Sequence, residues 1–274
     1  MTRVLQISDT HLSPRKTHFE ANWRPLRDWT VAQRADLVIH TGDVTVDGAD
    51  SDDDMRASAA LMDGLGVRYR AVPGNHDVGE VGNRHQPVNA ERLERWRRYF
   101  ECDRWYEDVA QWRLIGVDSM LFGDDSDEEA RQLAWLESAM SSAGTRKLAW
   151  FMHRPLFLES PDEPDTGYWS VKPAPRARLL ELVDRHRVAL VSTGHLHKWR
   201  DATVNGCRYV WSASSGFLVG PDNQPEMPGE KRLGATVFEF EGREVAVTHH
   251  DVAGLSTFWI DDVIHEVYPP RRAA

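Results

Sequence analysis

The residues best suited to chemistry in this chain stand at the ends of short apolar runs. Asn, Asp and His are common in turns, so one such residue after one run would carry little weight. Here the pattern repeats after five runs, and it takes in five of the 12 histidines. Carboxylate, amide and imidazole groups are metal ligands, so the pattern indicates a metal site. The residues concerned are Asp9, His11, Asp43, Asn75, His76, His153, His195 and His197.

The apolar runs alternate with segments of helical period, which favours an α/β fold with helices covering a sheet. In such folds the ligand site lies beyond the carboxyl ends of the strands, so we expect the polar residues to converge at one edge. Asn22 is expected to cap the first helix. The predicted strands are residues 3–7, 36–40, 67–72, 112–118, 147–153 and 188–195, and the predicted helices are residues 23–34, 55–65, 128–140 and 175–186.

After residue 200 the pattern changes to strands alone. The runs ATVNG, CRYVWSAS, ATVFEFEG and EVAVTHHD predict hairpins with Asn-Gly and Glu-Gly turns, which would form a second sheet or an antiparallel extension of the first. Two long Pro-rich and Gly-rich loops, 160–175 and 220–234, are expected to shape the substrate wall, because long loops in compact domains often line binding sites. We expect residues 1–274 to form one domain with this strand-rich C-terminal part.

The number of candidate ligands predicts a pair of metal ions. Even counted without His76, two carboxylates, one amide and four imidazoles exceed what a single ion needs, and a shared carboxylate would allow two ions to sit ~3.5 to 4 Å apart. Mixed nitrogen and oxygen ligands suit Mn, Fe, Zn or Co better than Ca or Mg. Two divalent ions with Asp9 and Asp43 would keep a surplus charge of about +2, which a hydroxide and a phosphate oxygen would neutralise.

Composition excludes several other classes of protein. The chain of 274 residues has a net charge of −10 and no basic stripe, so binding to a nucleic acid polymer is not expected. Its N-terminus enters a strand without a signal-peptide pattern, and no apolar run approaches the ~20 residues of a membrane span. Cys102 and Cys207 are too few for a disulfide framework. We therefore expect a cytoplasmic protein with no membrane segment, and its C-terminal hairpins could pair across a homodimer.

Five short motifs in order resemble the signature of the calcineurin-like metallophosphoesterase superfamily. They are DTH at 9–11, GDVTVDG at 42–48, GNHD at 74–77, FMHRP at 151–155 and GHLH at 194–197. The resemblance implies a four-layer αββα sandwich with the metal site at the carboxyl ends of the strands. It also implies that Asp43 bridges the two ions. One ion would be held by Asp9, His11, Asp43 and His197, and the other by Asp43, Asn75, His153 and His195.

The same resemblance implies catalytic roles for His76 and Asp77. His76 would face the substrate and protonate the leaving group, and Asp77 would orient its ring, while a metal-bridging hydroxide attacks phosphorus. The motifs are most similar to those of the small bacterial cyclic-nucleotide and glycerophosphodiester phosphodiesterases. That group commonly has a second His where this chain has Arg154, which could contact phosphate or face solvent.

We therefore expect a phosphodiesterase that acts on a small phosphodiester. A phosphomonoesterase using the same site is the nearest alternative. Phosphoprotein dephosphorylation is disfavoured, because the protein-phosphatase branch carries an Arg after its GD motif and the stretch TVDG here has none. A non-catalytic scaffold of this fold is also disfavoured, because such proteins usually lose ligands or the catalytic His, and this chain has all of them.

Overall fold

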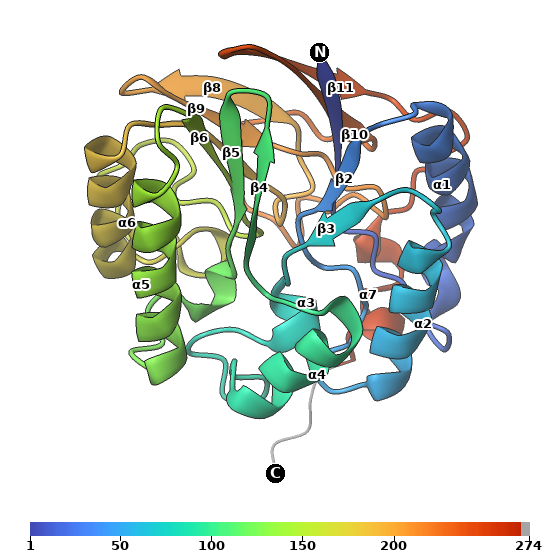
Figure 1. Cartoon of the computed structure of the whole chain (residues 1–274). Coiled ribbons are helices and arrows are strands. Elements are labelled where there is room, and N and C mark those ends of the chain that lie inside the picture. The colour runs from blue at the N-terminus through green and yellow to red at the C-terminus, as the bar shows by residue number, and fades with distance from the viewer. Residues whose placement is uncertain (270–274) are drawn as a thin grey trace.

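Two β-sheets packed face to face, with helices outside each, form the centre of the molecule. The computed structural model describes residues 1–269. In Figure 1, α5 (Asp127–Ser141) and α6 (Pro173–Arg185) cover one side of the sheets, and α1 (Trp23–Ala32) and α2 (Asp52–Asp63) cover the other. The layers follow the order helix, sheet, sheet, helix, which confirms the predicted α/β sandwich.

The first sheet has five strands in the order β11-β10-β1-β2-β3. Its three strands from the N-terminal part run parallel, and the C-terminal hairpin adds to β1 in the antiparallel sense. The strands are β1 (Thr2–Ile7), β2 (Leu37–His40), β3 (Tyr69–Ala71), β10 (Ala235–Glu241) and β11 (Glu244–His250).

The second sheet has six strands in the order β4-β5-β6-β7-β9-β8. The four inner strands run parallel, and the two outermost strands are antiparallel to their neighbours. The strands are β4 (Trp105–Val109), β5 (Trp112–Gly116), β6 (Lys147–Phe151), β7 (Val188–Thr193), β8 (Arg200–Val204) and β9 (Cys207–Trp211).

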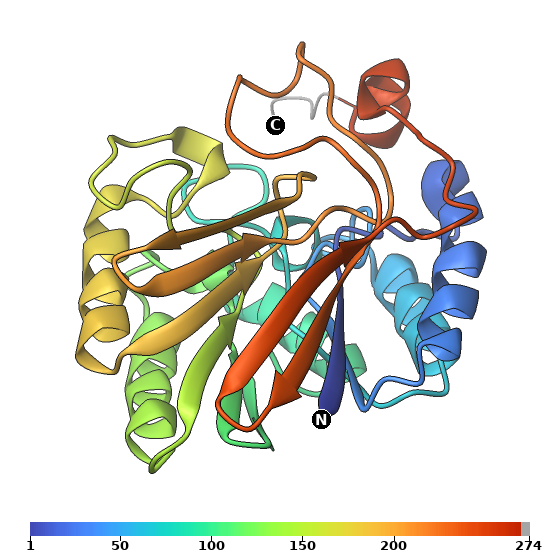
Figure 2. The ribbon, with the colours of Figure 1, turned by 90° about the horizontal axis from the view of Figure 1, so that it is seen from above.

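The two predicted C-terminal hairpins are present, and they join different sheets. The hairpin β8–β9, with Asn205 and Gly206 in its turn, extends the second sheet. The hairpin β10–β11, with Gly242 in its turn, extends the first. Figure 2 shows these two hairpins, in orange and red, along neighbouring edges of the sandwich.

Three of the longer helices begin at polar caps that satisfy free backbone N–H groups. Ser51, Asn89 and Ser126 accept from the backbone three residues onward, at the starts of α2, α4 (Ala90–Phe100) and α5. α4 and β4 were not predicted. The shorter elements are α3 (Asn75–Val78), α7 (Ile264–Val267) and the 3-10 helices η1 (Thr17–Asn22), η2 (Ser119–Leu121), η3 (Gly167–Trp169) and η4 (Ile260–Asp262).

The prediction that Asn22 caps the first helix is wrong. Asn22 is the last residue of η1 and already has helical backbone angles (φ −80°, ψ −18°), whereas a capping residue is normally extended. Its side-chain Nδ2 instead donates to the carbonyl oxygens of Gly216, at 2.8 Å, and Ser256, at 2.9 Å. Asn22 thus ties the start of α1 to loops from the C-terminal part of the chain.

Alternate residues of each strand face different layers. In β1, Val4 packs between the two sheets, and Leu5 packs against the helices outside the first sheet. Phe151 and Phe238 meet between the sheets with ring centroids 5.5 Å apart. Because both faces of these strands are buried, their sequences are almost continuously apolar. The packing holds the strand ends, and the loops that follow them, in fixed positions.

No described helix is long and apolar enough to cross a membrane. The prediction of one domain over residues 1–274 stays a prediction, and its last five residues, 270–274, lie outside the described part of the chain.

Candidate metal centre

All seven predicted metal ligands lie together at the carboxyl ends of β1, β2, β3, β6 and β7, and each is buried. Five of them have a backbone in the left-handed region, which L-residues other than Gly, Asn and Asp rarely adopt. Such strain persists only where the surrounding structure enforces it, and it concentrates at functional sites. The five are Asp9 (φ 54°), His11 (φ 46°), Asp43 (φ 52°), His195 (φ 70°) and His197 (φ 52°).

Two glycines are required by the crowding around these ligands. Gly42 has φ 92°, and a Cβ there would lie 2.7 Å from Nδ1 of His153. A Cβ on Gly74 would collide with the carboxylate of Asp43. Both glycines therefore allow the loops after β2 and β3 to approach each other closely.

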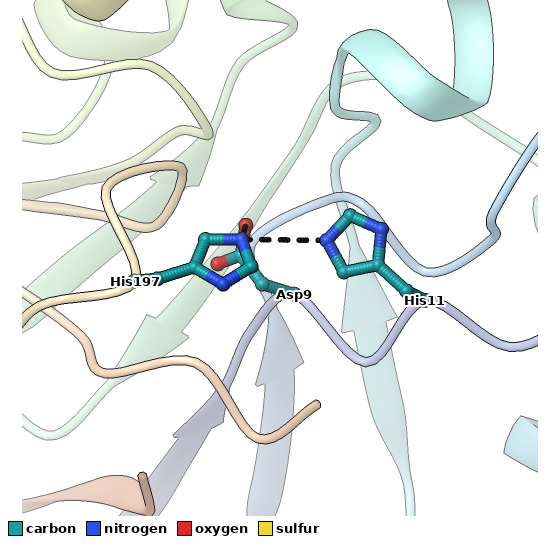
Figure 3. A group of neighbouring side chains, drawn as sticks. All are labelled: Asp9, His11 and His197. Atoms are coloured by element: carbon teal, nitrogen blue, oxygen red, sulfur yellow. Dashed lines mark hydrogen bonds and ion pairs between the residues drawn. The ribbon is translucent and has the colours of Figure 1, made fainter. Parts of the chain in front are cut away.

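One group of candidate ligands comprises Asp9, His11 and His197 (Figure 3). Nε2 of His11 and Nε2 of His197 face each other at 3.4 Å, which the dashed line in Figure 3 marks. Nε2 of His197 is also 3.4 Å from Oδ1 of Asp9. Oδ2 of Asp43 lies 3.8 Å from Nε2 of His11, at the border of this group.

A second group surrounds Nε2 of His153. This nitrogen lies 3.2 Å from Oδ2 of Asp43, 3.3 Å from Oδ1 of Asn75 and 3.2 Å from Nδ1 of His195. The same oxygen of Asp43 faces both groups. The geometry therefore offers two adjacent sets of ligand atoms with one carboxylate between them.

The outward nitrogens of three of these histidines define which ring nitrogen carries the proton. Nδ1 of His153 lies 2.8 Å from the carbonyl oxygen of Thr41, and Nδ1 of His197 lies 2.7 Å from that of Phe217. Nε2 of His195 lies 2.9 Å from the carbonyl oxygen of Tyr168. A carbonyl oxygen only accepts, so each of these nitrogens donates. In the neutral rings each inward nitrogen therefore carries no proton and presents a lone pair.

The inward atoms of the centre are consequently almost all acceptors. The lone pairs of His153 and His195 face each other and the carboxylate of Asp43, and such an arrangement is repulsive unless a proton or a cation lies between them. Nitrogen and carboxylate oxygen atoms in this combination suit borderline transition metals. Outward hydrogen bonds of this kind also orient imidazole ligands in metalloproteins. The residues present thus fit divalent metal ions.

Burial and charge shift the pKa values of the ligands in a consistent way. Burial lowers the pKa of His11 and of His195 well below the ordinary value, so both rings are neutral. For His153 burial acts in the same direction, but the charge of Asp43 and its hydrogen bond outweigh it and raise the pKa to about 9. Without metal, the proton on His153 stands where the donor set would hold a cation.

His76 lies at the edge of the centre, partly exposed. Its ring centroid is 5.1 Å from that of His11, and its backbone N–H donates to Oδ1 of Asp43 at 2.9 Å. One of its ring nitrogens lies within 4.8 Å of a ligand atom of His11 and of Asp43, so distance alone also permits a role as metal ligand. The structure therefore places His76 beside the candidate ligands, facing the cavity described below.

The prediction that Asp77 orients the ring of His76 is wrong. Asp77 is fully buried, and its carboxylate accepts from the backbone N–H groups of Gly74, Val44 and Thr45, at 2.9, 3.2 and 2.9 Å. Successive residues of a helix point about 100° apart, so neighbours in α3 do not face each other. Asp77 instead ties the GNHD loop to the GDVTVDG loop, and thereby positions Asn75 relative to Asp43.

Several residues at the centre were not predicted. Tyr168 belongs to the loop 160–175 that was expected to form the substrate wall, and its hydroxyl accepts from Nδ2 of Asn75 at 3.2 Å. The hydroxyl of Tyr268 lies 2.8 Å from Nδ1 of His11, and no sequence pattern indicated this residue. Arg154 does not face solvent, because it is buried, and its guanidinium forms an ion pair with Glu80.

Two other histidines near the centre have structural partners. His40 is buried, Nε2 lies 3.0 Å from the hydroxyl of Thr10, and Nδ1 accepts from the backbone N–H of Gly42. Burial lowers the pKa of His40 to about 3, so the ring is neutral. Nε2 of His18 lies 3.1 Å from Oε2 of Glu266. Neither residue belongs to the groups of candidate ligands.

A cavity of about 230 Å³ opens above the candidate ligands. Its polar floor includes His11, Asp43, His76, His195 and His197. Its walls come from the loop 160–175, the segment after β9 and the C-terminal segment, and they are mostly aromatic and aliphatic. The wall residues are Tyr168, Trp169, Phe217, Val219, Asn223, Ile260, Ile264 and Tyr268.

The chain is similar to known phosphoesterases. It is 26% identical to the Probable glycerophosphodiester phosphodiesterase GpdQ of Arcobacter nitrofigilis, over 83% of this chain and 83% of that protein. It is 31% identical to the Serine/threonine-protein phosphatase CPPED1 of Danio rerio, over 55% of this chain and 48% of that protein. The match to CPPED1 thus spans about half of that protein's length.

A solved structure shares the fold of this chain, and a family profile gives its classification. The crystal structure of a dimetal phosphatase from Danio rerio superposes with a TM-score of 0.63 at 13% identity, over 92% of this chain and 96% of that one, so the two share a fold. The profile of the Calcineurin-like phosphoesterase family matches residues 2–199, which contain all five motifs. The chain belongs to the calcineurin-like phosphoesterase family and is a hydrolytic metallophosphoesterase.

Proposed function

We propose that this protein is a binuclear metal-dependent phosphodiesterase that hydrolyses a small phosphodiester. The observation that carries the proposal is the pair of adjacent donor sets that share the carboxylate of Asp43. Asp9, His11, Asp43 and His197 would hold one divalent ion, and Asp43, Asn75, His153 and His195 would hold the other. Mn, Fe, Zn or Co suits this mixture of nitrogen and oxygen ligands. When bound, such ions supply Lewis-acid chemistry and activate water at neutral pH.

The chain's own residues have distinct roles in this proposal. His76 faces the cavity beside the ligands and would donate a proton to the leaving oxygen of the substrate. The amide of Asn75 offers Oδ1 to the centre, because its Nδ2 donates to the hydroxyl of Tyr168. Asp77 keeps the loops that carry Asn75 and Asp43 in register. The aromatic wall excludes water from the side of the cavity that would receive an organic ester group.

The charge of the cavity favours a diester over a monoester. A monoester dianion carries one more negative charge than a diester and gains from an additional cationic side chain. Among the described residues that line the cavity there is no Lys or Arg. The nearby Arg154 is occupied by Glu80. A small cavity with apolar walls instead suits a phosphodiester whose second ester group is organic, of the cyclic-nucleotide or glycerophosphodiester type.

A phosphomonoesterase remains the second candidate, because the chain is similar over about half its length to the phosphatase CPPED1. A non-catalytic scaffold has less support, since the donor sets and His76 are all present. We also propose a cytoplasmic location, because Cys102 and Cys207 are free thiols and fit a reducing compartment. The net charge of −10 argues against a nucleic acid polymer as substrate. Dimerisation through an edge hairpin stays a proposal.

The test compares hydrolysis of bis(p-nitrophenyl) phosphate and p-nitrophenyl phosphate by the metal-free protein after addition of Mn, Fe, Zn or Co in turn. We expect the diester to be hydrolysed faster with at least one metal, and Asp43→Asn to abolish the activity. Asp28→Asn, an exposed carboxylate on α1, is the matched control and should leave the rate unchanged. A higher rate on the monoester would favour the phosphomonoesterase. Bound metal without any hydrolysis would favour the scaffold.

A further inference from the structure

The end of the described chain returns to the metal centre and places one aromatic side chain there. Tyr268 follows α7, which Figure 2 shows in red at one margin of the molecule. Its hydroxyl lies 2.8 Å from Nδ1 of His11, and its ring centroid lies 4.5 Å from that of His76, with an angle of 32° between the planes. One residue outside the signature motifs thus contacts both a candidate ligand and the candidate acid.

The segment that carries Tyr268 is held in place by several independent contacts. Nζ of Lys16 donates to the carbonyl oxygen of Val267 at 2.7 Å, and His18 pairs with Glu266 at 3.1 Å. Val267 itself is fully buried in an apolar cluster that includes Phe19 and Phe217. These contacts come from the loop after β1, which also carries His11, and from the segment after β9. The position of Tyr268 is therefore set by the same loops that build the centre.

The hydroxyl of Tyr268 completes a pattern seen in the other ligand histidines. Nδ1 of His153, Nδ1 of His197 and Nε2 of His195 each donate to a backbone carbonyl oxygen. For His11 the corresponding partner is the hydroxyl of Tyr268. A hydroxyl can accept from Nδ1–H as a carbonyl does, and in that tautomer Nε2 of His11 carries a lone pair directed at His197 and Asp43. Unlike the carbonyl partners, this one can be removed by substitution.

The ring of Tyr268, and not the carboxylate of Asp77, packs against the ring of His76. In the described part of the chain the ring of His76 makes no hydrogen bond, and only its backbone groups do. Its neighbours are the edge-on ring of His11 at 5.1 Å and the tilted ring of Tyr268 at 4.5 Å. Packing between these two rings restricts the rotation of His76 about its side-chain bonds. We propose that Tyr268 is a positioning residue, whose hydroxyl orients His11 as a metal ligand and whose ring orients His76 toward the substrate.

This inference rests on the proposed metal centre, and two full-length variants separate its parts. Tyr268→Phe removes the hydroxyl and keeps the ring, while Tyr268→Leu removes both. Tyr106→Phe, on an exposed position of β4, is the matched control for loss of a hydroxyl. The measurements are Zn²⁺ affinity by chelator competition, metal content by elemental analysis, and hydrolysis rates on a dialkyl phosphodiester, whose leaving group is an alkoxide, and on bis(p-nitrophenyl) phosphate.

Tyr268→Phe should weaken one of the two bound ions about 10- to 100-fold, the usual loss when an outer hydrogen-bond partner of a ligand is removed, and should leave the ratio of the two rates unchanged. Tyr268→Leu should weaken the same ion and should also slow loss of the alkoxide more than loss of p-nitrophenolate, because only the alkoxide needs a proton. The control should match the wild type in every measurement.

Two results would overturn the inference. If Tyr268→Phe bound both ions within twofold of the wild type, the hydroxyl would have no role in orienting His11. If Tyr268→Leu slowed both esters equally, the ring would not orient His76. Tyr268→Phe is nearly isosteric, so the first test stands even where Tyr268→Leu fails to fold. A wild-type chain that bound no metal would instead refute the metal centre itself, and the inference with it.

Discussion

Metal binding by this protein is predicted to depend on pH through one histidine. Oδ2 of Asp43 lies 3.2 Å from Nε2 of His153 and holds a proton there, so the pKa of His153 is raised to about 9 although burial acts against the charge. Only the neutral ring offers Nε2 to a metal, because Nδ1 donates to the carbonyl oxygen of Thr41. Below pH 9 a metal ion must therefore displace this proton.

The size of the effect follows from the pKa. Each pH unit below the pKa weakens apparent binding tenfold, or by about 1.4 kcal/mol, so binding at pH 7 should be about 100-fold weaker than at pH 9. His11 and His195 add nothing to this dependence, because burial already lowers the pKa of each well below its ordinary value. His153 is therefore expected to contribute a dependence of one proton.

The assay is competition for Zn²⁺ with a chelator of known affinity, between pH 6 and pH 9.5. The dissociation constant of one bound ion should fall about tenfold per pH unit up to about 9 and then level off. Asp43→Asn is the informative variant, since it removes the carboxylate that holds the proton. It should bind zinc more weakly but with a shallower pH dependence. A wild-type affinity that did not change between pH 7 and pH 9 would refute the reasoning.

Three further predictions concern the two donor sets, His76 and the buried carboxyl of Asp118. Asp43→Asn should weaken the binding of both ions, because one oxygen of Asp43 faces both donor sets, whereas His197→Ala should weaken the binding of chiefly one. Elemental analysis of the metal content checks this prediction. Equal loss of both ions in His197→Ala would contradict the assignment of ligands to the two sets. His76→Ala should keep both ions. It should lose about 10²- to 10⁴-fold in hydrolysis rate on a dialkyl diester but much less on a p-nitrophenyl diester, because only the alkoxide leaving group needs a proton. Loss of metal in this variant would make His76 a ligand. Burial raises the pKa of Asp118 well above its ordinary value, and its Oδ2 has no hydrogen-bond partner among residues 1–269. The carboxyl's contribution to stability is therefore present below the unfolded-state pKa and is lost as pH rises through the folded-state pKa. Asp118→Asn should therefore raise the free energy of unfolding at pH 8 by about 1 to 2 kcal/mol and change it little at pH 4, as urea denaturation can measure, and equal effects at both pH values would contradict the assignment.

The candidate ligands could be predicted from the sequence because their positions follow from local rules. Apolar runs with helices between them predict parallel strands, and the carboxyl ends of parallel strands converge. Asp9 and His153 could therefore be expected to share one edge although they lie far apart in the chain. The hairpin β8–β9 could likewise be predicted, because Asn205 and Gly206 favour a tight turn.

The sequence by itself determined the kinds of ligand, their order and the layers of the fold, because side-chain type, period and turn chemistry are local properties. The tertiary structure alone decided which groups orient those ligands. Tyr268 reaches His11 across 257 positions of sequence, and that contact depends on how the end of the chain packs against the loop after β1. Asp77 follows His76 directly yet bonds the loop of Thr45, because the backbone of a helix turns adjacent side chains apart. His76 and Asp77 are adjacent in sequence, but the folded backbone points their side chains apart. His11 and Tyr268 are distant in sequence, but packing brings them together.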